Sequence, residues 1–376
     1  MIIIVNESRL VDLFLELAEI ASPSKQEGAL KDYLRAALEK RGLRVTEDQA
    51  GAAIEGEAGN LFAEIPGTAA GPVLLFSAHM DTVQPGVGIK ARVGADGIIR
   101  SEGETVLGGD DKIGIAALLE VYDVLKEEKI PHPPIEFLFT VCEEQGLLGV
   151  KNFDISRSKA EMGYVLDAGD DPGAIVLGSP ALNAFEYTVY GKAAHAGINP
   201  ETGLNAVKIA AAAIAKMPDG RIDHETTCSI GLIHGGTARN IVPEKCVAIG
   251  EARSINGSKL ADLTERLIRT FTEEVKKTGA RAETKVEQLY PEISLEPDNP
   301  AVRLAVRAVN SLGIAPKLIN TGGGSDASIL NAAGLSCVNL GVGMKDVHTC
   351  DEFVSVASLK EITEIVLAII KMGAMA

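Results

Sequence analysis

Apolar residues follow two spacings along this chain, and each spacing predicts one kind of element. Short runs such as residues 73–76 (VLLF), which have no polar position, predict buried strands of the parallel type. Longer segments with apolar residues three or four positions apart predict amphipathic helices between those runs. We expect helices at residues 10–21, 24–41, 115–126, 301–312 and 357–371, and strands at 60–65, 73–78, 135–141, 164–167 and 336–340. Strands that alternate with helices indicate an α/β domain with a doubly wound sheet.

Two local signals add detail to this domain. Ser24-Lys25-Gln26-Glu27 matches a capping box, which predicts the start of the helix that ends at Gly42. Residues 86–101 are rich in glycine and contain short apolar pairs, which indicates a hairpin or a loop.

The segment from residue 179 to residue 295 has a different pattern. We expect strands at residues 183–191, 228–233, 245–251 and 282–288, with helices at 204–216 and 260–277. The order β-α-β-β-α-β predicts a small antiparallel sheet with two helices, a ferredoxin-like α+β domain. We therefore expect one domain of residues 1–178 and 296–376, interrupted by a second domain of residues 179–295.

The composition fits a globular α/β protein and excludes two classes of partner. Of the 376 residues 46% are hydrophobic and 23% are charged, close to globular averages. The formal net charge of −16 argues against a nucleic acid partner, because phosphate binding needs clustered Lys and Arg. No run approaches the roughly 18 apolar residues of a membrane span.

The cysteines and the first residues predict a cytoplasmic location. The five cysteines, an odd number, are scattered without CxxC spacing, which fits reduced thiols. Residues 1–7 have no basic segment before a short apolar run, so they lack the pattern of a secretory leader.

His79 and Asp81 follow the strand expected at residues 73–78, at the edge where ligands bind in open α/β sheets. The period of two along an extended chain directs both side chains to the same side. A neutral imidazole binds zinc, and a carboxylate can accept the other ring N–H and fix the tautomer. The alternative is a hydrogen-bonded pair at the start of a loop.

Two acidic pairs stand in comparable places. Glu143 and Glu144 end the strand at residues 135–141, and in an extended chain they point opposite ways. One could then bind a metal while the other acts as general base, or both could be solvated surface acids. Asp110 and Asp111 follow two glycines at a helix start, where one could bind a metal or serve as an ordinary N-cap. The sequence pattern alone does not indicate which member of each pair binds a metal.

Asp167 ends a third strand, and His348 lies in a later loop. Separately, Asp167 could begin a turn with Gly169, and His348 could be an exposed loop histidine. Together with the residues above, they supply two histidines and a set of carboxylates at strand ends. This is the ligand mix of a two-metal hydrolytic site.

These residues stand in the order and approximate spacing of the M20 family of co-catalytic zinc metallopeptidases, which the chain resembles over nearly its whole length. The motifs that carry the resemblance are Ser77-Ala78-His79-Met80-Asp81, Gly109-Asp110-Asp111-Lys112-Ile113-Gly114, Glu143-Glu144, Asp167, Gly191-Lys192-Ala193-Ala194-His195-Ala196-Gly197, Pro200-Glu201-Thr202-Gly203-Leu204-Asn205-Ala206, Gly235-Gly236-Thr237-Ala238-Arg239-Asn240-Ile241-Val242-Pro243 and His348. Gly322-Gly323-Gly324-Ser325-Asp326-Ala327 suggests the peptidase T branch. Ser328 departs from that branch, where Asn is expected, and this leaves the exact substrate open.

The resemblance implies a phosphorylase/hydrolase-like catalytic domain with a mixed sheet and an inserted lid and dimerisation domain. It implies five ligands for two Zn²⁺ ions, or for Mn²⁺ or Co²⁺ in their place: His79, Asp110, Glu144, Asp167 and His348. His79 and Asp167 would complete one ion, Glu144 and His348 the other. Asp110 would bridge the two ions, Asp81 would orient His79, and Glu143 would be the general base. In the family, aspartate at position 167 goes with aminopeptidase-like substrates.

The resemblance also implies residues that contact the substrate. His195 resembles a catalytic histidine that reaches the active site of a neighbouring subunit and helps stabilise the tetrahedral oxyanion. Asn240 and Arg253 would bind substrate, the planar guanidinium suiting a peptide carboxylate. Gly323 and Ser325 belong to a loop whose glycines let the backbone approach the substrate; it is no P-loop, since no Gly-Lys-Ser/Thr follows. Without the resemblance, His195 reads as an exposed histidine and Arg253 as a strand-edge cation.

The implied activity is removal of the N-terminal residue from short peptides, tripeptides first, by a cytoplasmic homodimer. An N-acyl amino acid amidohydrolase or deacetylase with the same two-metal site is the first alternative. A non-catalytic binding protein on the same fold is the second.

Overall fold

The computed structural model describes residues 5–374 and divides the chain into two compact units. Unit 1 consists of Met1–Leu177, Leu295–Asn320 and Ser325–Ala376, and unit 2 of Gly178–Ser294 and Thr321–Gly324. Residues 1–4, on which the argument about a leader partly rests, lie outside the described residues, as do residues 375–376.

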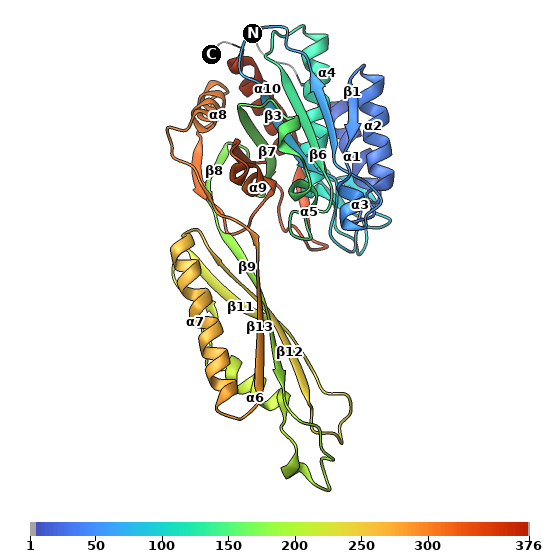
Figure 1. Cartoon of the computed structure of the whole chain (residues 1–376). Helices are drawn as coiled ribbons and strands as arrows, with labels where there is room; N and C mark the ends of the chain where they lie inside the picture. The colour runs from blue at the N-terminus through green and yellow to red at the C-terminus, as the bar shows by residue number, and fades with distance from the viewer. Residues whose placement is uncertain (1–4, 375–376) are drawn as a thin grey trace. The chain divides into compact units, whose positions relative to one another are not determined.

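The strands of unit 1 are joined by helices over most of its length (Figure 1). The helices are α1 (Glu7–Glu19), α2 (Gly28–Lys40), α3 (Ala50–Ile54), α4 (Gly109–Glu127), α5 (Leu148–Lys151), α8 (Pro300–Ser311), α9 (Asp326–Ala332) and α10 (Val356–Gly373). The strands are β1 (Arg44–Glu47), β2 (Leu61–Ile65), β3 (Leu74–His79), β4 (Ala91–Val93), β5 (Ile98–Ser101), β6 (Ile135–Thr140), β7 (Met162–Ala168), β8 (Ala174–Ser179, which continues into unit 2), β15 (Lys317–Asn320), β16 (Ser336–Gly341) and β17 (Phe353–Ser355).

The main sheet has nine strands in the order β1-β2-β6-β3-β7-β16-β8-β14, with β15 paired to β8. The central strands β6, β3, β7 and β16 are parallel, and β1, β2 and β8 pair antiparallel. Every residue of β3 is buried, so side chains on both faces of the strand are covered. Helix α4 packs on β3 and β7, α10 packs on α4 and α8, and α9 contacts β7 and β16. The predicted doubly wound mixed sheet is confirmed.

A second, three-stranded sheet joins β5 to β4 and β17. Its β4–β5 hairpin pairs Val93 with Ile99, so residues 86–101, expected to form a hairpin or a loop, contain a hairpin. The strands β1 and β8 and the helix α9 were not predicted. Each is four to seven residues long, and runs of that length do not establish a period.

Unit 2 is an antiparallel sheet with two helices. Its elements are β9 (Ala181–Tyr190), α6 (Ala206–Ile214), β10 (Gly220–Arg221), β11 (Thr226–Gly235), β12 (Lys245–Ser254), α7 (Gly257–Lys276), β13 (Arg281–Tyr290) and β14 (Ile293–Ser294). The strand order is β10-β11-β12-β9-β13. Without the two-residue β10 this is the order of a ferredoxin-like domain, so the predicted inserted α+β domain is confirmed.

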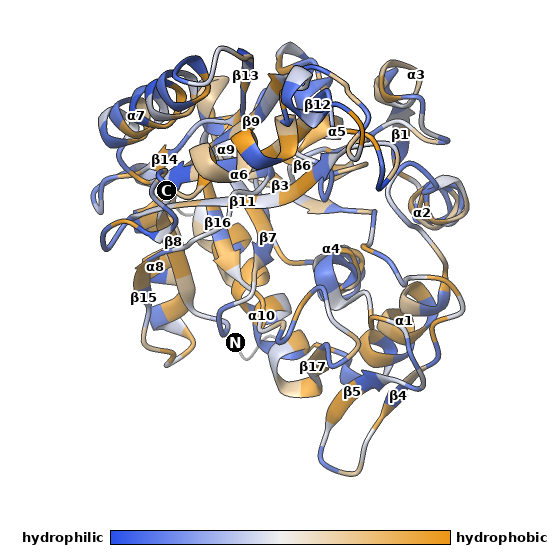
Figure 2. Cartoon of the chain, turned by 90° about the horizontal axis from the view of Figure 1, so that it is seen from below, coloured by the Kyte–Doolittle hydropathy of each residue, from blue (hydrophilic) through white to orange (hydrophobic). Residues whose placement is uncertain are grey.

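Helix α7 lies along this sheet in Figure 1 because apolar side chains at helical spacing form one stripe. The buried members of the stripe are Leu260, Leu263, Leu267, Phe271 and Val275. The ring of Phe271 lies 4.7 Å from that of Tyr187 on β9. Figure 2 shows α7 largely in the hydrophilic colour, with hydrophobic positions between. Between residues 5 and 374, the chain forms no helix with the length and apolar character needed to cross a bilayer.

Candidate active site

The predicted residues that follow the parallel strands lie at one edge of the main sheet. His79 is the last residue of β3, Asp167 lies near the end of β7, and Glu143 and Glu144 follow β6. These strands are neighbours in the order β6-β3-β7 and run parallel, so their carboxyl ends meet. The next strand, β16, leads into the loop that carries His348. The fold thus brings together residues that are far apart in the sequence.

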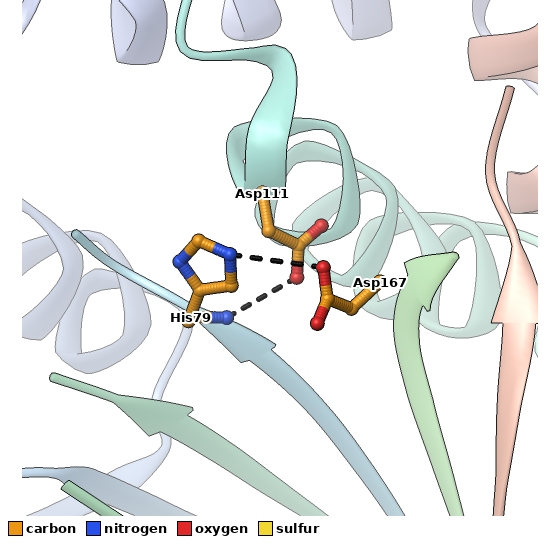
Figure 3. A group of neighbouring side chains, drawn as sticks. All are labelled: His79, Asp111 and Asp167. Carbon is orange, nitrogen blue, oxygen red and sulfur yellow. Dashed lines mark hydrogen bonds and ion pairs between the residues drawn. The ribbon is translucent and has the colours of Figure 1, made fainter. Parts of the chain in front are cut away.

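The two ring nitrogens of His79 have different partners. Nε2 lies 2.9 Å from Asp110 Oδ1 and 3.7 Å from Asp167 Oδ1, whereas Nδ1 lies 2.9 Å from the carbonyl oxygen of Asp81. Figure 3 shows the ring directed at the Asp167 carboxylate. Because a carbonyl oxygen can only accept, Nδ1 carries a hydrogen. Nε2 is therefore the nitrogen that a metal ion can use.

His348 contacts the same aspartate. Its Nε2 lies 2.9 Å from Glu144 Oε1 and 3.3 Å from Asp110 Oδ2. The two oxygens of Asp110 thus face different imidazoles, Oδ1 facing His79 and Oδ2 facing His348. A carboxylate shared in this way can serve two ions at once.

Asp111 is also close to the site, but its carboxylate has other partners. Its Oδ2 accepts the backbone N–H of His79 at 3.1 Å, and its Oδ1 accepts the N–H of Gly114 at 3.2 Å. Figure 3 shows this carboxylate beside the His79 backbone. The ligand-type atoms of His79, Asp111 and Asp167 lie within 4.8 Å of one another, as do those of His79, Asp110 and Glu144. By distance alone either Asp110 or Asp111 could be a metal ligand. Their hydrogen bonds distinguish them, because the Asp111 carboxylate accepts two backbone N–H groups and the Asp110 carboxylate faces the two imidazoles.

Glu143 and Glu144 stand in a turn and not in an extended chain, contrary to the expectation. Cys142 has a φ of +52°, in the left-handed region, so the chain leaves the strand direction before the pair. The N–H groups of Glu143 and Glu144 donate to the Asp81 carboxylate, at 2.8 and 3.2 Å. Glu144 contacts His348, whereas the buried carboxylate of Glu143 has no hydrogen-bond partner among residues 5–374.

Asp81 therefore organises more of the site than the predicted contact with His79. Its carboxylate also accepts the Ser24 hydroxyl at 2.7 Å and lies 3.5 Å from His79 Nδ1. Buried Glu27 accepts the backbone N–H of Cys142 at 3.0 Å. The predicted capping box is wrong, because α2 starts after it with no side-chain cap, and Ser24 and Glu27 bind the loops of the site instead.

Burial and crowding oppose ionisation of most acidic residues here. Burial raises the pKa of Asp167 well above its ordinary value, and the charges of Glu143 and Asp110 raise it further. Burial likewise raises the pKa values of Glu143 and Glu144. Asp110 differs: burial opposes its ionisation, but hydrogen bonds to the two histidines hold its pKa below the usual range.

Both histidines lie where positive charge is favoured. Burial alone would lower the pKa of His79, but hydrogen bonds to Asp110 and Asp81 raise it well above its ordinary value. Hydrogen bonds to Asp110 and Glu144 raise the pKa of His348 to about 10. Buried carboxylates combined with imidazole nitrogens form a donor set suited to Zn²⁺, Mn²⁺ or Co²⁺. The residues present therefore fit two divalent metal ions.

His195 and Asn240 lie together in unit 2, where the N–H of Ala196 donates to the Asn240 carbonyl at 2.9 Å. The Nδ1 of His195 accepts the N–H groups of Gly197 at 3.1 Å and Ile198 at 3.2 Å. In the neutral ring these two donors place the hydrogen on Nε2. The exposed edge of His195 is thus a hydrogen-bond donor.

Arg253 lies on β12, near the glycine loop. Its guanidinium makes two hydrogen bonds to the Glu251 carboxylate, at 2.7 and 3.2 Å, and its Nη1 is 3.4 Å from the carbonyl oxygen of Gly322. The space beside Gly323 is open, since a Cβ there would meet nothing within 4 Å. Ser325, by contrast, is only 2% exposed. The Ser325 side chain, predicted to contact substrate, is therefore not accessible in this structure.

The sequence did not predict that three residues contact the loops of the site: Ser24, Glu27 and Glu352. The Glu352 carboxylate accepts backbone N–H groups of the loop that carries Asp110. The partners of these three residues are 57, 115 and 242 positions away in the chain. No local pattern signals contacts at such separations.

Two protein-family models match parts of the chain. The model described as the peptidase dimerisation domain of M20 peptidases matches residues 178–279, which lie within unit 2. The model described as peptidase family M28 matches residues 60–208, a range that includes β3, β6 and β7.

Similar proteins also span the whole chain. The crystal structure of a tripeptidase from Staphylococcus aureus has a TM-score of 0.95 and 39% identity, covering 99% of this chain and 100% of its own. The crystal structure of aminopeptidase PepT from Bacillus cereus has a TM-score of 0.90 and 41% identity, covering 98% and 99%. The uncharacterized protein YqjE of Bacillus subtilis is 40% identical over 98% of this chain and 100% of its own.

Proposed function

This chain belongs to the M20 family of metallopeptidases, in its peptidase T-like branch, and we propose that it removes the N-terminal residue from tripeptides. The observation that carries the proposal is the Asp110 carboxylate, which faces one histidine with each oxygen. The relatives described as a tripeptidase and as aminopeptidase PepT support the substrate class.

We assign the metal ligands from their contacts in unit 1. His79 and Asp167 would hold one ion, Glu144 and His348 would hold the other, and Asp110 would contribute to both. Zinc suits imidazole and carboxylate ligands, and manganese or cobalt suits the same set. The chemistry supplied by the bound ions is polarisation of the scissile carbonyl and a lowered pKa of the attacking water.

Glu143 is the proposed general base. Its backbone is anchored on Asp81, while its buried carboxylate is free of hydrogen bonds to other described residues. Glu143 takes a proton from the attacking water and passes it to the leaving amine. Glu144 is unsuited to this role because its carboxylate is held by His348.

His195 supplies the proposed donor to the tetrahedral oxyanion. Such a donor must carry a hydrogen at the atom that faces the developing charge. The two backbone N–H groups on Nδ1 support this role, because they leave the hydrogen on Nε2.

His195 and Arg253 stand at opposite ends of the sheet in unit 2. Lys245, the first residue of β12, is at the His195 end, and Arg253 is eight residues further along the strand. At about 3.3 Å per residue the separation is about 26 Å, whereas an extended tripeptide spans about 10 Å. We therefore propose that His195 and Asn240 act in the active site of a second copy. Residues 179–295 would then be the lid and dimerisation domain of a homodimer, as the family-model match supports.

A cytoplasmic location completes the proposal. All five cysteines are free thiols, and four of them are buried. Unpaired cysteines in this number are typical of a reducing compartment.

The function is tested with a panel of three substrates: a tripeptide, the same tripeptide N-acetylated, and an N-acetyl amino acid. The purified protein is assayed after chelation and after zinc, manganese or cobalt is added back. We expect metal-restored cleavage of the free tripeptide only, because an aminopeptidase must recognise the free ammonium. Cleavage of the acylated compounds alone would instead identify an amidohydrolase. A metal-loaded protein that cleaves none of the three would contradict the proposed activity.

Mixed dimers test the role of His195 across subunits. A His195→Ala subunit keeps Glu143, and a Glu143→Ala subunit keeps His195. If the histidine acts in the partner's site, verified heterodimers contain one complete active site and regain activity that neither variant has alone. Heterodimers without activity would argue against this arrangement.

A further inference from the structure

Glu352 holds the loop that leads to Asp110. The residue is 2% exposed, and its carboxylate accepts the backbone N–H groups of Leu107 at 2.8 Å, Gly108 at 2.9 Å and Asp110 at 3.0 Å. The first two donate to Oε2 and the third donates to Oε1. Backbone N–H groups that converge on one anion form a nest. Here the anion is a side chain of the same protein.

The two glycines of the loop permit this arrangement, Gly108 through its backbone conformation and Gly109 through the space it leaves beside the carboxylate. Gly108 has a φ of +71°, a conformation that favours glycine. A Cβ on Gly109 would lie 3.1 Å from Glu352 Oε1 and 2.7 Å from a methyl carbon of Val354. The backbone conformation of the loop therefore fits the Glu352 carboxylate.

Glu352 is also fixed relative to His348. The segment from residue 345 to residue 353 closes on itself, because Lys345 and Phe353 exchange backbone hydrogen bonds at 3.1 Å. His348 lies inside this closed segment and presents its ring to the Asp110 carboxylate. Four residues later, Glu352 binds the Asp110 backbone. One short segment thus contacts Asp110 at both its side chain and its main chain.

We propose that Glu352 is a positioning residue for the two-metal centre and keeps the Asp110 carboxylate in register with His348. This inference rests on the metal centre of the proposed function. Asp110 has φ and ψ of −79° and 102°, outside the helical region, and its N–H is one that a helix start leaves unpaired. Without Glu352, the backbone N–H of Asp110 would lose its acceptor, and the Asp110 carboxylate would be positioned only by its contacts with His79 and His348.

Glu136 offers a matched control. It is also 2% exposed, and its carboxylate accepts the N–H of Lys159 at 2.9 Å and the hydroxyl of Ser158. It stands near the start of β6, whereas the other end of that strand, at Thr140, leads to the site. A Glu136→Gln change disturbs a buried, hydrogen-bonded glutamate away from the metal ligands.

The experiment compares Glu352→Gln, Glu136→Gln and the unmodified protein. Each is stripped of metal, titrated with Zn²⁺ against a competing chelator, and loaded with Co²⁺, whose visible absorption reports ligand geometry. We expect Glu352→Gln alone to bind at least one ion roughly 10- to 100-fold more weakly and to show an altered Co²⁺ spectrum. Unchanged affinity and spectrum in folded Glu352→Gln would overturn the inference. An unmodified protein that binds no metal would instead overturn the proposed function.

Glu352→Asp serves if the glutamine variant does not fold. It keeps the negative charge but is one methylene shorter, so it cannot reach all three N–H groups. If both variants fold, a Zn²⁺ affinity of Glu352→Asp between those of the unmodified protein and Glu352→Gln supports a positioning role. If only Glu352→Asp folds, a Zn²⁺ affinity weaker than that of the unmodified protein supports it. The inference would be overturned if Glu352→Asp kept the Zn²⁺ affinity and Co²⁺ spectrum of the unmodified protein while its melting temperature fell as in Glu136→Gln. Glu352 would then have a structural role only.

Discussion

Replacing Glu143 by glutamine tests the proposed base without changing the size of the side chain. General acid–base catalysis contributes typically 10²- to 10⁴-fold, so kcat should fall by about that factor, or about 3–5 kcal/mol of barrier. Metal content should be retained, because the metal ligands assigned above do not include Glu143. The structure therefore predicts an inactive protein that still binds both ions.

The same change should stabilise the metal-free protein. Burial raises the pKa of Glu143, and the charges of Asp326, Glu144 and Asp81 raise it further. A carboxyl whose folded pKa lies above its unfolded pKa destabilises the fold as the pH rises through that interval. We therefore expect metal-free Glu143→Gln to be more stable than the unmodified protein at pH 7.5. The gain should vanish near pH 4, where the carboxyl is protonated in both states.

Three measurements decide the outcome. They are steady-state kinetics on a tripeptide, metal analysis, and thermal unfolding of the metal-free protein at the two pH values, where 1 kcal/mol shifts the midpoint of a 376-residue chain by about 1 °C. Near-normal kcat in Glu143→Gln would refute the assignment of the base, and loss of metal would make Glu143 a ligand. Glu144→Gln is the matched control and should lose metal.

Three further predictions address other parts of the molecule. Asp110→Asn should lose metal, whereas Asp111→Asn should bind it better than Asp110→Asn but lower stability by about 1–3 kcal/mol, since Asn offers one acceptor oxygen to two N–H groups that now use both oxygens of Asp111. Metal analysis and urea unfolding compare them, and the reverse order would exchange their roles. Arg253→Lys cannot reproduce the two hydrogen bonds to Glu251 and should raise KM for a tripeptide about tenfold with little change in kcat. An unchanged KM would remove Arg253 from substrate binding. Burial raises the pKa of Glu27 to about 7 from 4.5, so its ionisation destabilises the fold by about 3–4 kcal/mol as the pH rises through that interval. Metal-free Glu27→Gln should accordingly gain stability at pH 8 and not at pH 4, and a gain independent of pH in denaturant titrations would contradict this cause.

The strand ends were the predictable part of the site. An apolar run followed by His79 and Asp81 is a local signal, and a parallel sheet brings the ends of such runs to one edge. The same reasoning reached Asp167 and the pair Glu143 and Glu144. It succeeded because the period of apolar residues depends only on nearby positions.

The choice between neighbouring residues was not predictable, because it depends on distant partners. Asp111 faces the backbone of His79, 32 positions earlier in the chain, and this contact leaves Asp110 to the imidazoles. Ser24 could have capped its own helix, but it donates to the ionisable Asp81 carboxylate instead. Hydrogen bonds to charged groups are stronger than those to neutral groups, so the tertiary partner prevails over the local motif.

The place of β16 in the main sheet has a consequence for synthesis of the protein. In space β16 lies between β7 and β8, but in the chain all of β9 to β13 is made before it. A ribosome that adds about 5–20 residues per second takes roughly 9–35 s to pass from the end of β7 to the end of β16. Throughout that time β7 can pair with β3 on one edge but lacks β16 on the other, and an unpaired strand edge invites pairing with other chains. His348 emerges later still, so the nascent chain cannot complete the proposed set of metal ligands until this residue has been made.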